Sequence, residues 1–547
     1  METQVESRPL GFSSLPRQQV MVTFGGVLLA MFLGAVSQTV IGPAMPKIIS
    51  DLGGFSRYTW VAIANTVASA VTIPIIGKLT DMYGRKYFYI GGIAIYTTAS
   101  LLSGLSTTMN QLITFRAIAG IGGGAMMSNA ITVIGDLFPP AERGKYQGFT
   151  SGVYGVSSVL GPTLGGFLTD ALSWRWVFFF SVPLGLLVII VFVFVFPHVR
   201  PDNLKHRIDY LGLSTLVLAV VSLMLALSLA RVQYSWNSPQ ILGMLGFAAL
   251  MLVVFVMIER RAEEPILPLW LFRNPIISVS AVVVFVTGLG MFGSLIFLPL
   301  FFQGVLGVTA TVSGSFMIPM HLALIAGSFT SGQLLSRAGG HYRIQGIIGI
   351  VIMGAGMALL ARMGTDTQYS TALINIALTG FGLGITMPLY TIAVQNAVPY
   401  NLMGVATSST MFFRSIGGSV GLAMLGSVMS SRFSAELTAR LPAAIKGVIS
   451  PQVINSLANN PQVLVSAEAQ ARLQTIFSQM GSAGSALYEQ TFQALRQSLS
   501  SAISEAFLVS VAIMAIAFVA NFFLKEIPLR KEHSLEVSLP EKRQKKN

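Results

Sequence analysis

The sequence predicts an all-α polytopic membrane protein, built as two six-helix bundles with two further helices inserted between them. Hydrophobic residues make up 53% of the 547-residue chain and charged residues only 10%, and the mean hydropathy is +0.71. A soluble globule of this length does not have that composition. Apolar stretches long enough to cross a bilayer recur along the chain. A short polar connection between two such stretches occurs once in each half.

A hydrocarbon core of about 30 Å needs roughly 20 apolar residues per helix. Fourteen stretches reach that length, and an even number places both termini on one side of the membrane. The first is too long for a signal-peptide core and lacks a small-residue cleavage site, so we expect it to remain as a helix. The predicted spans are 20–42, 57–77, 86–105, 111–134, 145–169, 176–196, 208–230, 239–259, 276–300, 309–334, 344–363, 369–396, 404–430 and 502–524.

The polar connection Gly77-Lys78-Leu79-Thr80-Asp81-Met82-Tyr83-Gly84-Arg85-Lys86 joins the second and third spans. Its glycines permit a sharp turn, and Asp81 can accept hydrogen bonds from an exposed helix start. A weaker copy at 332–340 joins the tenth and eleventh spans, and this repeat indicates a duplicated unit. Two such bundles with a cleft between them are the plan of an alternating-access transporter. The predicted segments are 1–19, a bundle at 20–196, inserted helices at 208–259, a bundle at 276–524 and a basic tail at 525–547.

Basic residues predict the orientation. Loops on one side carry most of the lysines and arginines, including Arg85, Lys86 and Arg143, whereas the short loops of the other side hold Lys47, Arg57, Arg175 and Arg231. The positive-inside rule then places both termini in the cytoplasm of a protein of the inner or plasma membrane. We interpret the net charge of +13 as topology and contact with anionic lipids, and we expect no nucleic-acid partner.

Several function classes are disfavoured. The chain has no Cys and five His, which removes disulfides, thiol nucleophiles and thiolate metal sites. The glycine run at 120–124 lies inside an apolar span rather than after a strand, so helix packing explains it better than a nucleotide loop. We therefore expect no enzyme, no cofactor and no metal site.

One connection, 431–500, is long and polar and is predicted to be external. Two stretches in it show helical periodicity, which favours a pair of amphipathic helices at the outer surface, with a disordered linker as the alternative. Their apolar residues are Ala469, Leu473, Ile476, Phe477 and Met480 in the first stretch, and Tyr488, Phe492, Leu495 and Leu499 in the second.

Arg116, His321 and Arg414 lie well inside predicted spans, where a charge is costly enough to make each a functional candidate. The arginines can hold substrate or relay protons, with structural pairing as the alternative. His321 can titrate near physiological pH, or it is simply hydrogen-bonded. No Asp or Glu falls in the middle of a predicted span. Those nearest to a span are Asp136, Asp209, Glu259 and Glu505, all near span ends.

The spacing Gly-x-Leu-x-Asp-x-x-Gly-Arg-Lys at 77–86 resembles the signature of the major facilitator superfamily, and the fourteen spans resemble its drug:proton antiporter branch of the quaternary-ammonium efflux type. Leu112-x-x-x-Arg116-x-x-x-Gly120 is similar to a second signature of that superfamily. The small residues of the fifth span permit close helix packing, and its proline permits a bend. Their antiporter role is implied by the resemblance; they are Gly152, Gly155, Gly161, Pro162, Gly165 and Gly166.

We interpret the connection as a gating latch formed by Gly77, Asp81, Gly84, Arg85 and Lys86, in which Asp81 and Arg85 pair with a neighbouring helix when the cytoplasmic mouth is closed. A plain tight turn is the alternative for the glycines.

The segment beginning Ser37-Gln38-Thr39-Val40 resembles a family motif that carries an acid where Ser37 stands. Exchange of protons for a cationic drug needs a buried carboxylate, so this departure moves the expected cargo toward neutral or anionic, lipid-like amphiphiles. Ser37, Gln38, Arg116, Asp136, His321, Arg414 and Glu505 are the candidates for coupling or substrate binding.

We therefore expect a monomeric transporter that exports amphiphilic compounds by alternating access, with protons and membrane lipids as partners. A lipid exporter with weak or absent proton coupling is the first alternative. A membrane receptor or channel is a more distant one, because it does not predict the repeat.

Overall fold

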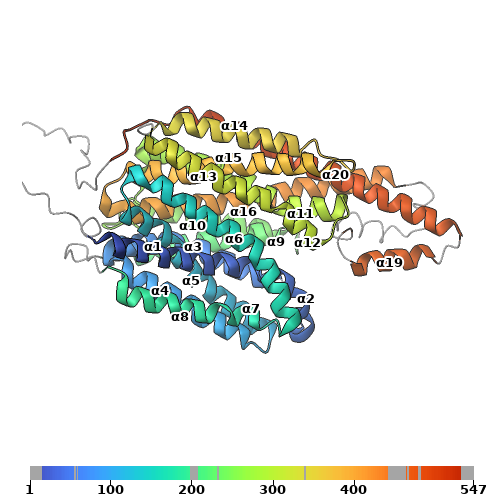
Figure 1. Cartoon of the computed structure of the whole chain (residues 1–547), viewed down its shortest axis with the longest axis horizontal. Coiled ribbons are helices and arrows are strands. Elements are labelled where there is room, and N and C mark those ends of the chain that lie inside the picture. Colours follow the sequence, from blue (N-terminus) through green and yellow to red (C-terminus); the bar gives the residue numbers. More distant parts are fainter. Residues whose placement is uncertain are drawn as a thin grey trace, which may run out of the picture.

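A computed structural model of the chain describes residues 15–53, 57, 59–197, 207–230, 233–337, 341–441, 464, 467–478 and 482–530. These residues form long, roughly parallel helices in two bundles (Figure 1). The first described residues and the end of the last helix both lie at the left in Figure 1, and we call this the near end and the opposite one the far end.

The N-terminal bundle runs from near end to far end and back along six long helices, with two short ones. Gly53 and Gly84 have positive φ angles of 67° and 92°, where glycine is favoured. Its helices are α1 (Arg17–Thr39), α2 (Ile41–Leu52), α3 (Thr59–Tyr83), α4 (Arg85–Gly104), α5 (Met109–Leu137), α6 (Pro140–Ala171), α7 (Trp176–Phe179) and α8 (Ser181–Val195).

Two apolar helices, α9 (Tyr210–Leu229) and α10 (Pro239–Glu259), form a hairpin that packs against α3 of the first bundle and α16 of the second. The C-terminal bundle follows, and the end of its first long helix passes into a π-helical turn. Its elements are η2 (Leu269–Arg273), α11 (Pro275–Leu300), η3 (Phe301–Val305), α12 (Ala310–Phe316), α13 (Ile318–Arg337), α14 (Tyr342–Leu360), α15 (Tyr369–Asn396), η4 (Tyr400–Leu402), α16 (Met403–Arg440), α19 (Ala467–Ser478) and α20 (Ser482–Asn521).

Among the described residues, 12 helices are long and apolar enough to cross a membrane. The predicted spans 86–105 and 145–169 correspond to α4 and α6, which are of membrane-spanning length but are not among those 12 helices. Both pack against long neighbouring helices. α4 contacts α5 and α8, and α6 contacts α1 and α13. Glycine, serine and threonine lower their hydropathy, and the same small residues allow close packing. The chain is thus an all-helical, multi-pass membrane protein in its described part.

The long polar connection differs from the prediction. α16 continues to Arg440 rather than ending near 430, and α20 begins at Ser482 rather than near 502. The first predicted amphipathic helix corresponds to α19, whereas the second is the beginning of α20 itself, which buries Leu495 and Leu499. Both α19 and the start of α20 project beyond the far end of the bundles (Figure 1). Residues 442–463 and 479–481 lie outside the described part of the chain, as do 1–14 and 531–547.

Candidate functional site: the contact between the two bundles

The predicted polar connection is a break of one residue. α3 continues through Tyr83 and α4 begins at Arg85, so only Gly84, with φ 92° and ψ 160°, leaves the helical conformation. The prediction that Gly77 also serves the turn is wrong, because Gly77 lies inside α3.

Gly77 instead allows α3 to approach α16. A Cβ atom at Gly77 would clash with the hydroxyl of Ser408 and would lie 2.8 Å from the carbonyl oxygen of Gly404. Gly404 is equally confined, since a Cβ there would lie 2.6 Å from the carbonyl oxygen of Gly77. The two glycines therefore bring one helix of each bundle into backbone contact at the near end.

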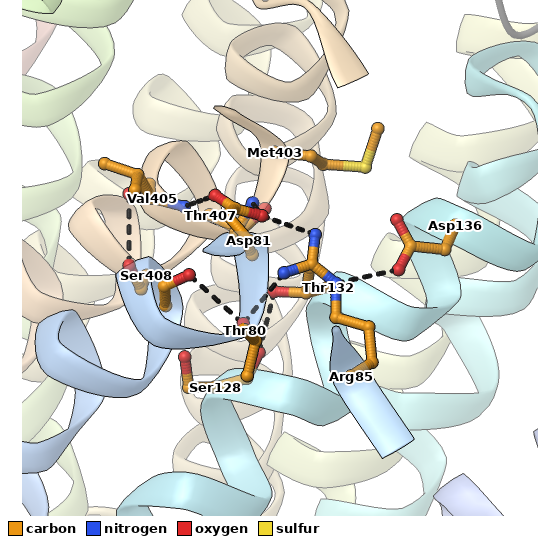
Figure 2. Close-up of polar contacts among 12 residues, drawn as sticks. Thr80, Asp81, Arg85, Ser128, Thr132, Asp136, Met403, Val405, Thr407 and Ser408 are labelled. Atoms are coloured by element: carbon orange, nitrogen blue, oxygen red, sulfur yellow. Dashed lines mark hydrogen bonds and ion pairs between the residues drawn. The ribbon is translucent and has the colours of Figure 1, made fainter. Parts of the chain in front are cut away.

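Asp81 lies one turn further along α3 and caps the start of α16 (Figure 2). Its two carboxylate oxygens accept hydrogen bonds from the backbone N–H groups of Gly404 (2.9 Å) and Val405 (2.7 Å). These are among the four N–H groups that a helix start leaves without an internal partner, and the helix dipole favours a negative charge there. The side chain is 4% exposed. A carboxylate of the first bundle thus holds a helix of the second.

Arg85 places a positive charge between two carboxylates. Its guanidinium lies 2.5 Å from Asp81 and 3.0 Å from Asp136 of α5, and it donates a third bond of 2.8 Å to the hydroxyl of Thr80 (Figure 2). Asp136 is fully buried and Arg85 is 7% exposed. Buried carboxylates are stable when paired and hydrogen-bonded, so Arg85 fixes Asp81 in the position that α16 requires.

Lys86, predicted to belong to this latch, lies elsewhere. Its ammonium group donates hydrogen bonds of 2.9 Å to the carbonyl oxygens of Val193 and Phe196, at the C-terminal end of α8. A lysine at a helix C-terminus satisfies free carbonyls and the negative end of the dipole. Both helices belong to the first bundle, so the geometry gives Lys86 a role within that bundle.

Arg143, which the sequence analysis did not select as a site residue, also bridges the bundles at the near end. It donates to the carbonyl oxygens of Phe138 (2.8 Å) and Gly135 (2.5 Å) in the first bundle, and to the side-chain oxygen of Gln395 on α15 (3.2 Å). Arg143 is 1% exposed, although a basic residue in a short loop normally indicates a solvated flank.

The weaker copy of the connection forms a second contact, between α6 and α13. A Cβ atom at either Gly144 or Gly332 would clash with the backbone of the other. Between the same two helices, the hydroxyls of Ser151 on α6 and Ser328 on α13 form a hydrogen bond of 2.9 Å. Gly332 thus occupies the place in the second repeat that Gly77 occupies in the first.

The glycines of the predicted fifth span fall into two groups in α6. Gly155 faces His321 of α13, while Gly161 and Gly165 pack against the α1–α2 junction at Thr39 and Val40. By contrast, a Cβ atom at Gly166 would meet nothing within 4 Å, and one at Gly152 would barely reach Ile325, at 4.0 Å. Pro162 lies inside α6, which remains one continuous helix. Close packing therefore accounts for part of this set.

Two of the predicted candidates, Arg116 and Ser37, contact each other. The Nη1 atom of Arg116 donates to the Ser37 hydroxyl at 3.4 Å, and the residue is 3% exposed. Its Nε atom is buried without a hydrogen-bond partner, and no carboxylate in the described part of the chain lies within ion-pair distance. Gln38, the neighbouring candidate, is exposed. A cation is therefore held inside the first bundle without a matching anion.

The remaining candidates are dispersed. The His321 ring bonds at 2.8 Å to the carbonyl oxygen of Met317, the residue that precedes α13, as a structural histidine does. Arg414 donates to the carbonyl oxygen of Met387 at 3.1 Å. Glu505 pairs with Arg432 at 3.0 Å toward the far end. None of these three joins Asp81, Arg85 and Asp136.

The fold and the site define a multi-pass membrane protein whose two helical bundles meet through buried polar contacts at one end. The chain belongs to the Major Facilitator Superfamily, whose family model matches residues 27–422. The resemblance to this superfamily, inferred from the sequence motifs, is thereby confirmed.

Two bacterial relatives cover most of the chain. The multidrug transporter protein MdtP of Bacillus subtilis (strain 168) is 38% identical over 519 residues, which is 94% of this chain and 95% of the relative. Multidrug resistance protein 3 of the same strain is 39% identical over 415 residues, or 75% and 80% of the two chains. This chain is therefore similar in sequence to named multidrug transporters.

Solved structures with the same fold are more distant in sequence. The human organic anion transporter MFSD10 has a TM-score of 0.58 and 12% identity, covering 91% of this chain and all of that one. The proton:xylose symporter XylE has a TM-score of 0.57 and 13% identity, covering 95% and 99%. At these identities the likeness concerns the fold.

Proposed function

We propose that this protein is a secondary active transporter that exports amphiphilic compounds across the cell membrane by alternating access, acting as a monomer with its near end toward the cytoplasm. Membership of the superfamily and the named multidrug relatives support export. The observation that carries the mechanism is the capping of α16 by Asp81, because it ties the two bundles together at one end.

Opening of the near end separates α16 from α3 and costs Asp81 both backbone donors. Hydrogen bonds to a charged group contribute about 1.5–3 kcal/mol each. The latch therefore biases the protein toward the state closed at the near end by a few kcal/mol. A ligand shifts such an equilibrium only by its differential affinity for the two states, and cargo entering from the cytoplasmic leaflet supplies that difference.

Asp81 and Asp136 are the two carboxylates of the latch that could take up the coupling proton, and both form ion pairs with Arg85. Protonation of Asp81 removes the charge that caps α16, so uptake of a proton there weakens the latch. Glu505 is a weaker candidate because it pairs with Arg432 toward the opposite end.

Arg116 contacts no carboxylate among the described residues, and this favours a second candidate function, export of anionic or lipid-like amphiphiles. A buried cation without a counter-charge is costly, and an anionic group on the cargo would complete it. Ser37 is the partner of Arg116 in the described structure, and its hydroxyl supplies no charge.

Transport in proteoliposomes tests both candidates. The purified protein is reconstituted, a pH gradient is imposed, and efflux of a cationic dye is compared with that of a fluorescent fatty acid. We expect saturable transport of at least one cargo, accelerated by the gradient. A large unitary conductance in planar bilayers, with no saturable transport, would instead identify a channel.

The Ser37→Asp variant separates the two kinds of cargo. A carboxylate at this position pairs with Arg116, so we expect transport of the anion to fall about tenfold relative to the cation. Ser37→Ala is the matched control, since it removes the hydroxyl without adding charge. Equal effects of both variants on both cargoes would place substrate recognition away from Arg116.

A further inference from the structure

A groove of about 620 Å³ lies beside α16, toward the far end and away from the latch. Trp236, from the turn between α9 and α10, forms one wall, and α16 and α20 form the rest. Its walls combine apolar side chains with two charges, and the residues used below are Trp236, Met424, Val428, Ala435, Arg432 and Glu505.

The groove opens away from the core of the second bundle. Its residues on α16 recur every three or four positions, from Met424 through Val428 and Arg432 to Ala435, which is one stripe of a helix. A different stripe of the same helix, with Leu425 and Phe433, is buried in the core. The groove is therefore on the outside of the bundle, beside the inserted hairpin.

The length of α16 is compatible with a groove near the headgroups of the far leaflet. Arg432 follows Gly404, at the near end, by 28 residues in one continuous helix, which corresponds to about 42 Å along the axis. A bilayer with its headgroup regions is about 40–45 Å thick, so Arg432 reaches the far headgroup level when the start of α16 lies at the near one, and Met424 then lies within the hydrocarbon core. Trp236 is fixed there by a hydrogen bond of 3.0 Å from its indole nitrogen to Ser427, and tryptophan is typical of the membrane interface.

The two charged residues of the groove, Arg432 and Glu505, belong to a row of ion pairs that continues along α16 beyond the groove. Arg432 lies 3.0 Å from Glu505 and 2.8 Å from Glu436, and Glu436 lies 2.9 Å from Arg440. These two arginines and two glutamates cancel in charge. The side chains of Arg432 and Glu505 are 47% and 42% exposed, so both are accessible to a ligand.

We propose that this groove binds a zwitterionic phospholipid. The phosphate lies on Arg432, the ammonium group lies on Glu505, and an acyl chain follows Met424 and Val428 toward the membrane centre. An exposed ion pair contributes only about 0–1 kcal/mol, so its replacement by two new pairs with the headgroup costs little. An anionic headgroup would leave Glu505 without a cation, and a lone cation would leave Arg432 without an anion.

Under the orientation proposed above, this lipid belongs to the outer leaflet. The site itself does not rest on the transport activity, because binding is measured without it. Failure of the lipid measurement and failure of transport are therefore distinguishable.

Native mass spectrometry of the full chain tests the proposal, with phosphatidylethanolamine, phosphatidylcholine and phosphatidylglycerol as probes at matched concentration. We expect one retained zwitterionic lipid per chain, at least fivefold preferred over phosphatidylglycerol. The double variant Arg432→Gln, Glu505→Gln should lose that preference. The matched control is Arg207→Gln, Glu263→Gln, which removes an exposed ion pair of 3.2 Å at the near end and should change nothing.

A conservative variant keeps the test decisive if the neutral one does not fold. Arg432→Lys, Glu505→Asp retains both charges in place, beside Glu436, and should retain the preference. Equal retention of phosphatidylglycerol, or an unchanged preference in the neutral variant, would overturn the proposal. Displacement of the lipid by tetraphenylphosphonium would also overturn it and would identify the groove as a cargo site.

Discussion

The two contacts between the bundles share their packing but differ in charge. In each, a glycine of the second helix of one repeat meets a glycine of the fifth helix of the other: Gly77 meets Gly404, and Gly332 meets Gly144. Four residues after Gly77, Asp81 caps α16. Four residues after Gly332 stands Ser336, which is exposed. The repeat therefore preserves the close backbone approach, whereas the charged cap belongs to one contact.

This difference indicates how the two contacts contribute. The α6–α13 contact rests on small residues and on one hydroxyl pair, so its separation removes little electrostatic energy. The α3–α16 contact combines the same close approach with a carboxylate, a guanidinium and a helix start. We expect the α3–α16 contact to determine how long the near end stays closed.

Asp81→Asn should have the largest effect, because it removes the charge from the cap with almost no change in shape. It also leaves Arg85 with Asp136 as its remaining acid. We expect efflux to fall below about a tenth of wild type while the protein stays in the membrane. The chain has no cysteine, so a single Ser408→Cys reporter can follow opening by maleimide labelling, which should become faster.

The matched control for Asp81→Asn is Glu263→Gln, which removes an exposed carboxylate at the same end of the molecule. It should leave both efflux and labelling unchanged. Normal efflux by the Asp81→Asn variant would remove the gating role of the α3–α16 contact.

Gly404→Ala should have the next largest effect. The added methyl group would lie 2.5 Å from a carboxylate oxygen of Asp81 and 2.6 Å from the Gly77 carbonyl oxygen, so the helices must separate. Overpacking of this kind costs about 1–3 kcal/mol. Thermal unfolding of the purified protein should show a lower midpoint, and labelling of the Ser408→Cys reporter should accelerate.

Gly144→Ala sharpens the comparison, since it overpacks the other contact. It should lower the midpoint by a similar amount and leave labelling at Ser408→Cys nearly unchanged, because the Asp81 cap remains. Gly123→Ala is the control for helix propensity alone, as its methyl group would meet nothing within 4 Å. Equal labelling in the Gly404→Ala and Gly144→Ala variants would mean that the two contacts open as one.

Arg143→Lys should have an intermediate effect. Lysine keeps the charge, but its ammonium group cannot reach Phe138, Gly135 and Gln395 together, as the planar guanidinium does. We expect a loss of efflux of a few fold, measured in the same assay. The Gln395→Ala variant removes only the bond between bundles and should reproduce most of that loss if this bond is what matters.

The parts of this site that the sequence predicted are those with a side-chain signature. Asp81 and Arg85 stand out as charges in an apolar chain, and the small residues of α6 indicate close packing. The glycine pairs Gly77–Gly404 and Gly144–Gly332 were not predicted. The sequence predicted that Asp81 accepts hydrogen bonds from a helix start, but not that this helix is α16, because backbone N–H groups at a helix start carry no residue type. Arg143 was overlooked for a related reason, since two of its three acceptors are backbone carbonyls.

The ends of the long helices were predicted less well than their middles. Hydropathy falls after residue 430, yet α16 continues because Phe433 and Leu437 remain buried in the core. The ion pairs that Glu436 forms one turn away with Arg432 and Arg440 add a smaller contribution. A hydropathy profile identifies the apolar segment that crosses the membrane. It does not show where a helix that extends beyond the membrane ends. The same limit applies to the start of α20.

Lys86→Gln should have the smallest effect, although Lys86 belongs to the same sequence signature as Asp81. Its bonds to Val193 and Phe196 lie within the first bundle, so they persist whether the near end is open or closed. We expect efflux within about twofold of wild type, unchanged labelling at Ser408→Cys, and a slightly lower unfolding midpoint, since a charge at a helix C-terminus contributes about 0.3–1 kcal/mol. A loss of efflux as large as that of Asp81→Asn would mean that Lys86 acts on the latch through α8, and the comparison would then have to include that helix.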